Sequence, residues 1–154
     1  MKLVISKIFL ALMIAISGFS IAVETNKLGK IVSASGTFEI NLEPQRDEDA
    51  PAGRMIIHKK YSGDLEGIGI GQMLSKRTEN GASAYSAIEE FKGSLAGKTG
   101  SFTLVHNGYM STGVQSLEVK ILEGSGKGEL EDISGSFQII QDEGKHKYVL
   151  TYEL

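Results

Sequence analysis

Glycine recurs at short intervals along this chain of 154 residues, between short runs of β-branched and aromatic residues. The sequence contains 19 glycines but only 2 prolines. Glycine placed between such runs is typical of many short strands that are joined by tight turns. After Ala22, no window of about 11 residues shows the apolar stripe of a helix. The spacing therefore predicts an all-β protein.

Alternation of apolar and polar residues indicates which faces of the outer strands are buried. The segment from Ile31 to Leu42 places apolar side chains on one face and polar side chains on the other, and the segment from Lys147 to Leu154 does the same. Strict alternation is the pattern of a strand with one buried and one solvated face. The predicted buried faces are Val32, Ala34, Phe38, Ile40 and Leu42 in the first segment, and Tyr148, Leu150, Tyr152 and Leu154 in the last.

Six more strands are expected between these two, and Glu43–Gly53 is expected to be a solvated loop. Eight consecutive antiparallel strands with short links favour a single eight-stranded antiparallel β-barrel, which removes the sheet edges. An open sandwich is the alternative. The six expected strands are Arg54–Tyr61, Leu65–Arg77, Ala82–Lys92, Lys98–Asn107, Val114–Leu122 and Ile133–Ile140.

The first 22 residues have the pattern of a signal peptide. Lys2 and Lys7 provide a short positive region, and Ile8–Ile16 is an apolar run that is too short to span a bilayer. Small residues at Ser20 and Ala22 match what signal peptidase reads, so cleavage is expected after Ala22. The sequence thus predicts a signal peptide over 1–22, a barrel domain over 23–154, and a periplasmic or secreted location. An uncleaved membrane anchor is the alternative.

Charge and cysteine content restrict the partners of the mature chain. Without Lys2 and Lys7 it has 14 basic and 19 acidic residues, hence a net charge of −5. This balance argues against nucleic acid and against an anionic membrane surface. The chain has no cysteine, so neither a disulfide framework nor a lipid on an N-terminal cysteine is available. We expect a soluble protein after cleavage, with a homo-oligomer as one option.

Motifs for cofactors fail on their spacing. The stretch Gly93–Thr99 resembles a phosphate loop but is one residue short, and Gly67-x-Gly69-x-Gly71 lacks the dinucleotide spacing. The three histidines, His58, His106 and His146, are too far apart in sequence to form a metal-ligand motif. The sequence therefore predicts neither a metal nor another cofactor.

Two turn signals predict the register of the central strands. Asn80-Gly81 is a strong two-residue hairpin signal, which would place Gln72 opposite Glu89. A second tight turn at Ala96-Gly97 would place Glu89 opposite Leu104 and bring His106 to the diagonal position. The inner face predicted from both registers carries Ile68, Ile70, Leu74, Tyr85, Phe91, Phe102 and Leu104.

Three polar residues, Gln72, Glu89 and His106, fall on this apolar face. A buried carboxylate needs partners or takes up a proton. The preferred interpretation is a structural cluster, because buried polar groups are usually hydrogen-bonded to one another. The alternative is an acid–base or ligand-orienting site, with Glu89 as proton acceptor and His106 as its partner. The candidate ligand-binding residues are Gln72, Tyr85, Glu89, Phe91, Phe102, Leu104 and His106.

Several motifs in order resemble a known family. They include Ser35-Gly-Thr-Phe38, Tyr61-Ser-Gly-Asp-Leu-Glu-Gly67, Gly97-Lys-Thr-Gly-Ser-Phe102, His106-Asn-Gly108 and a closing Tyr148–Leu154 segment. With these the chain resembles domain-of-unknown-function family 3224 over almost all of its mature length. The resemblance implies an allene oxide cyclase-like β-barrel and no function, because the family is uncharacterised. No cyclase residues are carried over, since fold kinship alone does not transfer activity.

Three functions remain open at this point. The first is a barrel that binds a small apolar or amphipathic molecule, because eight-stranded barrels can hold one small ligand. The second is an isomerase or cyclase-type enzyme that uses Glu89 and His106. The third is a structural or oligomeric interaction protein with a packed barrel and an apolar patch on its outer wall.

Overall fold

The computed structural model describes residues 30–154, so the predicted signal peptide lies outside the described residues. The described chain consists of strands and loops, and none of its residues forms a helix long and apolar enough to cross a membrane. The strands are β1 (Val32–Gln45), β2 (Gly53–Gly63), β3 (Leu65–Arg77), β4 (Ser83–Leu95), β5 (Lys98–Ser111), β6 (Val114–Ile121), β7 (Lys127–Gly128), β8 (Ser134–Asp142) and β9 (Lys145–Glu153).

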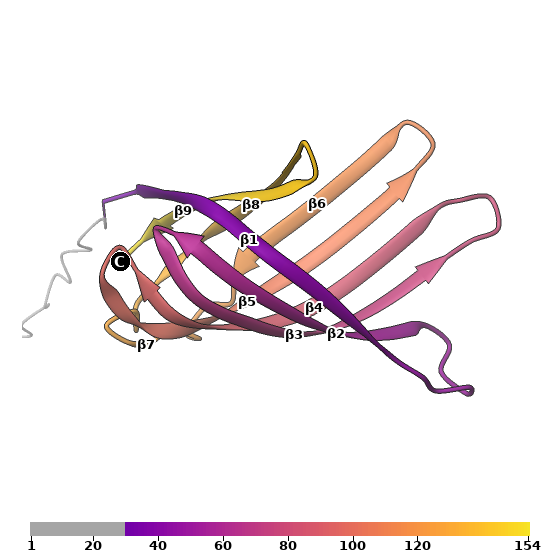
Figure 1. Ribbon diagram of the computed structural model, residues 1–154, viewed down its shortest axis with the longest axis horizontal. Helices are drawn as coiled ribbons and strands as arrows, with labels where there is room; N and C mark the ends of the chain where they lie inside the picture. The colour runs from indigo at the N-terminus through magenta and orange to yellow at the C-terminus, as the bar shows by residue number, and fades with distance from the viewer. Residues whose placement is uncertain (1–29) are drawn as a thin grey trace, which may run out of the picture.

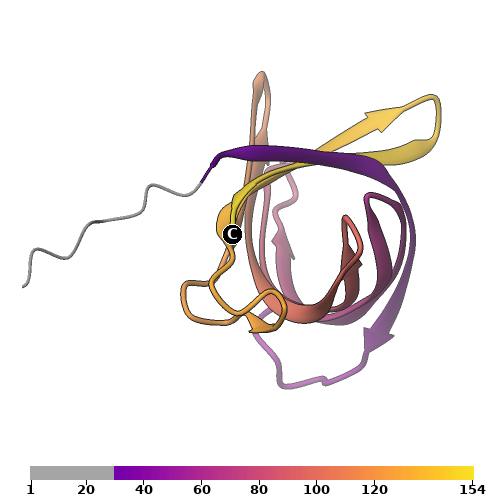
Figure 2. The same ribbon diagram turned by 90° about the vertical axis from the view of Figure 1, so that its left-hand side faces the viewer.

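Eight of these strands form one antiparallel barrel (Figures 1 and 2). Around the ring the order is β4-β3-β2-β1-β9-β8-β6-β5, and pairing between β4 and β5 closes it. The first strand therefore pairs with the last, from Val32 opposite Tyr152 to Phe38 opposite His146. The predicted eight-stranded barrel is confirmed. The short β7 was not predicted. It pairs with the part of β5 that lies beyond the end of the β5–β6 pairing.

The barrel has two unlike halves along its length. In the closed half, the strands pair around the ring, and β6 joins β8 at Lys120 and Ser136. In the open half, β1 to β6 continue past the end of the shorter β8–β9 hairpin, as Figure 1 shows. On the β1 side, pairing with β9 stops at Phe38. On the β6 side, Lys120 opposite Ser136 is the single register pair with β8 in the described chain.

The closed half is filled by side chains. The Tyr61 ring meets Phe91 and Phe137 edge-on at centroid distances of 5.6 Å and 6.0 Å. The connection between β6 and β8 adds Leu130 and Ile133, which are 0% and 2% exposed. Burying one such apolar side chain stabilises the fold by about 1.5–3 kcal/mol. The core comprises Ala34, Phe38, Tyr61, Leu65, Phe91, Leu95, Phe102, Leu104, Val119, Ile121, Leu130, Ile133, Phe137, Tyr148, Leu150 and Tyr152.

The open half leaves inward-facing apolar side chains uncovered. Ile40 and Leu42 continue the inner face of β1 beyond Phe38, yet they are 37% and 42% exposed. On the other side of the half, Met110 of β5 and Leu117 of β6 are 44% and 39% exposed. Their register places them on the same face as the core residues of their strands. Part of the predicted inner face therefore lines an open trough.

The predicted register between β3 and β4 is wrong by one residue. Five residues, Thr78 to Ala82, lie between the two strands, and the Thr78 N–H donates to the Ala82 carbonyl at 2.8 Å, which closes a three-residue loop from Glu79 to Gly81. Only Gly81 needs a positive φ (87°), because a three-residue hairpin requires one left-handed position where the expected two-residue turn requires two. Thr78 thus lies opposite Ala82, and the first register pair of the two strands is Arg77 with Ser83.

A shift of one residue moves every side chain of a strand to the opposite face. Ile68, Ile70 and Leu74 were predicted on the inner face, but they lie on the outer wall and are 51%, 51% and 49% exposed. In their place, Gly69 and Gly71 of β3 face inward and are buried. The outer wall therefore carries an apolar patch that the sequence placed inside.

The second predicted register is confirmed. Ala96 and Gly97 form a two-residue turn with φ values of 49° and 85°, both in the left-handed region. Between β4 and β5, Phe91 lies opposite Phe102, Glu89 opposite Leu104 and Ala87 opposite His106.

Candidate functional site

A buried polar cluster lies on the inner face, around the fully buried Glu89. Lys59 of β2 donates from its Nζ to Glu89 Oε2 at 2.6 Å. The hydroxyl of Tyr61, also in β2, donates to Glu89 Oε1 at 2.6 Å. Lys59 Nζ also donates to the Tyr61 hydroxyl at 3.2 Å. Both carboxylate oxygens therefore have donors, as a buried carboxylate requires.

His106 completes the cluster from β5. Its Nε2 lies 3.1 Å from Glu89 Oε2, and its side chain is 2% exposed. The Nε2 atom lies off the line of a hydrogen bond and has no hydrogen-bond partner. The predicted contact between Glu89 and His106 is confirmed as proximity within one cluster.

Gln72 does not belong to this cluster, and its predicted position opposite Glu89 is wrong. The residue that pairs with Glu89 is Gly71, because of the one-residue shift in β3. Gln72 lies on the outer wall, where its Nε2 donates to Gln45 Oε1 at 2.7 Å.

The inward-facing glycines of β3 make room for the cluster. A Cβ atom at Gly69 would lie 2.1 Å from Glu89 Oε1 and 3.0 Å from Tyr61 Cε2. A Cβ atom at Gly71 would lie 3.1 Å from the Glu89 Cβ. The Gly-x-Gly-x-Gly pattern, which fails as a nucleotide motif, thus has a packing role: it leaves space beside β3 for a large polar side chain of β4.

Lys59 and Tyr61 were missed as members of the cluster. The sequence signal that could have found them is the period of two in β2, which puts Ile57, Lys59 and Tyr61 on one face. Since Ile57 and Tyr61 are apolar or aromatic, that face must be the inner one, and Lys59 must then be a buried cation that needs a carboxylate. Lys59 Nζ also lies 4.8 Å from the centroid of the Phe38 ring.

The electrostatics of the cluster keep Glu89 ionised. Burial alone would raise the pKa of Glu89, but His106, Lys59 and the Tyr61 hydroxyl together lower it from 4.5 to about 2. Burial is also the main cause that raises the pKa of Tyr61, followed by the charge of Glu89 and its hydrogen bond. The centre of the cluster is therefore a lysine–carboxylate ion pair with a neutral tyrosine.

The cluster lies at the boundary of the two halves. The inward-facing residues of β4 cross this boundary. Phe91 belongs to the closed core, Glu89 and Ala87 follow in the direction of the open half, and Tyr85 lies within the open half. Phe91, Phe102 and Leu104 were predicted on the inner face and are confirmed there, at 0–1% exposure in the closed core. Of the predicted ligand-binding residues, only Tyr85 therefore faces the trough.

Tyr85 is half-buried and lies across Gly108 of β5. A Cβ atom at Gly108 would lie 2.2 Å from Tyr85 Cε1, so glycine is what allows the ring to lie flat on the neighbouring strand. Burial, and after it the charge of Glu89, raises the pKa of Tyr85, which keeps the hydroxyl neutral.

Two hollows open onto the inner face of the open half. One, of about 120 Å³, is bordered by Tyr85, Gly108, Met110 and Leu117. The other, of about 580 Å³, lies at the strand edge where β1 and β9 part, and its border combines Phe38 and Ile40 with the polar Glu39, Lys145 and His146. A further hollow of about 280 Å³ lies at the β6–β8 seam and contains none of the cluster residues.

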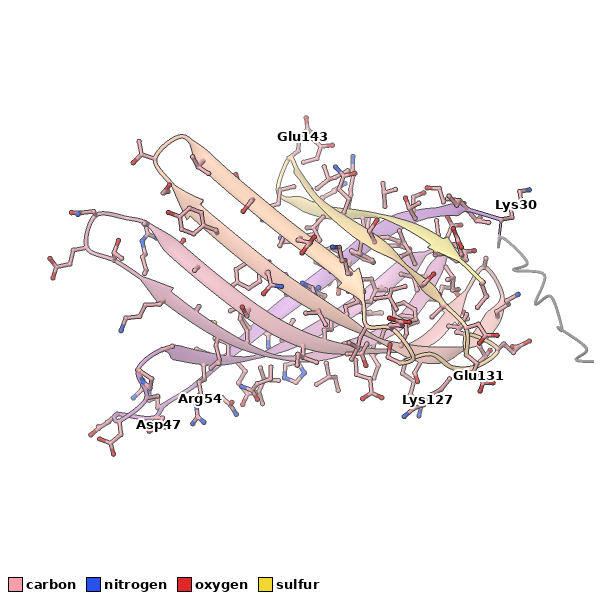
Figure 3. The ribbon with its side chains drawn as sticks, turned by 180° about the vertical axis from the view of Figure 1, so that it is seen from behind. Lys30, Asp47, Arg54, Lys127, Glu131 and Glu143 are labelled. Carbon is pink, nitrogen blue, oxygen red and sulfur yellow. The ribbon has the colours of Figure 1, made fainter. Side chains whose placement is uncertain are left out.

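The part of the chain that the structure describes contains no group of three or more His, Cys, Asp or Glu side chains placed to hold a metal ion. The acidic tip between β1 and β2 instead forms a surface ion pair, Arg54 Nη2 to Asp47 Oδ2 at 3.1 Å; both residues are labelled in Figure 3.

Comparison with known proteins gives a family and a fold. The family model described as "Protein of unknown function (DUF3224)" matches residues 34–152. The fold is similar to the crystal structure of a protein of unknown function from the DUF3224 family of Shewanella oneidensis MR-1. The two share 32% sequence identity with a TM-score of 0.75, over 80% of this chain and 97% of the other. No curated protein matches the chain.

Proposed function

Because the chain belongs to the DUF3224 family, a family of unknown function, we propose a function from the geometry of this barrel itself: it binds a small apolar or amphipathic molecule in its open half. The observation that carries the proposal is the trough. Inward-facing Ile40, Leu42, Met110 and Leu117 are 37–44% exposed, although the same face is fully packed further along the same strands. Apolar walls around a hollow are what small-molecule sites share.

The polar cluster gives the trough a floor. Lys59, Glu89 and His106 are at most 5% exposed, and Lys59 and Glu89 satisfy each other. A ligand would therefore contact mainly the apolar walls, together with Tyr85, Ser83 and Gln115, which supply polar groups at the border of the smaller hollow. This arrangement supports an apolar body with few polar atoms as the ligand.

The enzyme alternative has less support. A general base works best when its pKa lies near the operating pH. The pKa of Glu89 is lowered to about 2, and both of its oxygens already accept hydrogen bonds. The cluster therefore serves better as a support for the barrel wall than as a proton acceptor.

A second candidate function, association through the outer wall, is favoured by one observation. Ile68, Ile70 and Leu74 of β3 and Ile88 of β4 are 49–60% exposed on neighbouring outer positions. Contiguous apolar patches of this kind can mark protein interaction sites.

Binding of a fluorescent fatty-acid analogue to residues 23–154 tests the proposal. Leu42→Arg places a charge in the trough, so we expect its affinity for the probe to fall about tenfold or more, since a buried charge is costly. Leu74→Arg is the matched control, because it alters a leucine of similar exposure on the outer wall and should leave binding unchanged. Equal affinity in both variants, or no uptake by the unaltered protein, would rule the trough out as the binding site.

A further inference from the structure

One side of β6 has no strand partner over most of its length. On its other side, β6 pairs with β5 throughout, from Val114 opposite Ser111 to Ile121 opposite Leu104. With β8, the described chain forms only the register pair between Lys120 and Ser136. Figures 1 and 3 show β6 and the β8–β9 hairpin diverging from this point toward the open half.

The pairing with β5 shows which backbone groups of β6 point to the free side. The Leu122 N–H donates to the Thr103 carbonyl of β5 at 2.8 Å. In an antiparallel ladder, alternate residues direct their N–H and C=O groups to the same neighbour. Residues 114, 116 and 118 therefore bond to β5, while Gln115 and Leu117 direct their N–H and C=O groups to the free edge.

This edge lacks the usual protection against pairing. Proteins blunt free edges with proline, charged residues or bulges. The free edge of β1 beyond Phe38 carries Glu39, Glu43 and Pro44, but residues 114–117 of β6 contain neither charge nor proline. At the end of the β8–β9 hairpin, Asp142 and Lys147 form an ion pair on the surface. Residues 114–117 of β6 therefore lack this protection, as do residues 137–141 of β8 on the other side of the same opening.

We propose that two copies of this protein pair through their β6 edges, antiparallel about a two-fold axis at Ser116. Gln115 then lies opposite the partner subunit's Leu117, so that both residues use the backbone groups that are free in one copy. Glu118, the one charged residue between Val114 and Val119, lies opposite the partner subunit's Val114. Like charges do not face each other, and the small Ser116 meets its symmetry mate at the axis.

Pairing in this way also completes the trough. The open half has no wall on the far side of Leu117, which is 39% exposed. In the dimer, the partner subunit's β6 would continue the sheet there and present its own Leu117 to the same side. The second copy is favoured over an unrelated extended peptide because the segment is self-complementary in charge and size.

Sedimentation velocity over a concentration series tests the proposal on residues 23–154. We expect a reversible dimer. Gln115→Pro removes a backbone N–H that forms no bond within the barrel. In the proposed dimer each copy donates this N–H once, so two hydrogen bonds are lost and the dissociation constant should rise about tenfold or more. Gln115→Ala keeps the N–H and should dimerise like the unaltered protein.

Two further measurements keep the result unambiguous. Ile88→Lys alters the outer wall and should leave the dimer intact; a dimer lost in this variant but kept in Gln115→Pro would overturn the proposal. So would a monomer at every concentration. Amide hydrogen exchange requires no variant: the Gln115 and Leu117 amides should become protected as concentration rises, and unchanged exchange across a dimerisation transition would also overturn it.

Discussion

The closed and open halves of this barrel are built from the same strands, yet they differ in almost every physical property. On β5, Phe102 is 1% exposed and its ring lies 4.9 Å from that of Phe91. On the same face of the same strand, Met110 is 44% exposed. The strand does not change between these two positions; what changes is the presence of β8 and β9 opposite.

This difference separates the half that stabilises the fold from the half for which we propose ligand binding. The closed half supplies the apolar burial that holds the barrel together, while the open half leaves apolar side chains that contribute little to folding. The ion pair of Lys59 and Glu89 lies between them. Three substitution pairs test this division, each comparing one half or one face with the other.

The largest effect is expected for truncation in the closed half. Phe91→Ala should lower the free energy of unfolding by about 3–5 kcal/mol, because it leaves a cavity in a packed aromatic core. Leu42→Ala in the open half should cost less than about 1 kcal/mol, since that side chain is 42% exposed. Urea unfolding monitored by tyrosine fluorescence measures both. Similar losses in the two variants would contradict the division into halves.

The second effect concerns pH and the boundary cluster. The pKa of Glu89 is lowered in the folded protein from 4.5 to about 2, so its ionised form stabilises the fold at higher pH. This contribution, about 3 kcal/mol, is fully present above the unfolded pKa and is lost as the pH falls through the folded pKa. Urea midpoints measured from pH 7 downward should therefore decrease between about pH 5 and pH 2.

The matched variants for this window are Glu89→Gln and Glu90→Gln. Glu89→Gln should be less stable at pH 7, because it leaves Lys59 as a buried cation without its carboxylate, and should lose most of the pH dependence. Glu90 lies on the exposed face of the same strand, so its variant should keep the pH profile of the unaltered protein. A steep acid dependence that survives in Glu89→Gln would show that other carboxyl groups cause it.

The smallest of the three effects is expected for the inward-facing glycines. Gly69→Ala puts a Cβ atom 2.1 Å from Glu89 Oε1, so the cluster must shift, at a cost of about 1–3 kcal/mol. Gly53→Ala is the control, because its Cβ would meet Ser75 at an ordinary 3.5 Å. The midpoint of thermal unfolding should be lower for Gly69→Ala than for the unaltered protein, and nearly unchanged for Gly53→Ala. Equal midpoints would mean that Glu89 can move at no cost.

The sequence predicted the barrel and half of the cluster, and the two hairpins explain why only half. Ala96-Gly97 forms the expected two-residue turn, so Glu89 and His106 were correctly placed on one face. Asn80-Gly81 carries the same signal, but Glu79 is also part of the loop. This additional loop residue shifts the β3–β4 register by one, so the side chains of β3 face opposite to the predicted direction. Loop length, rather than strand pattern, decided this face, since Ile68 and Ile70 alternate with glycine on either reading.

Charge alone could not show that Lys59 is buried, because the neighbouring Lys60 carries the same charge and is exposed. Its partner Glu89 is 30 residues away along the chain, on a strand with which β2 does not pair. Such a contact across the interior depends on barrel curvature, which local alternation does not report. The open half was unpredicted for a related reason: strand lengths near β8 and β9 depend on where the turn at Glu143-Gly144 falls.

The pairing of β1 with β9 has a kinetic consequence. Val32 and Tyr152 are neighbours in the sheet although almost the entire described chain lies between them. Contacts of such high sequence separation form late and slowly, because the loop they close costs entropy before any contact is gained. The ring cannot close until the nine residues of β9 have been synthesised. A chain that is synthesised from its N-terminus therefore first forms an open sheet, in which one edge of β1 has no strand partner.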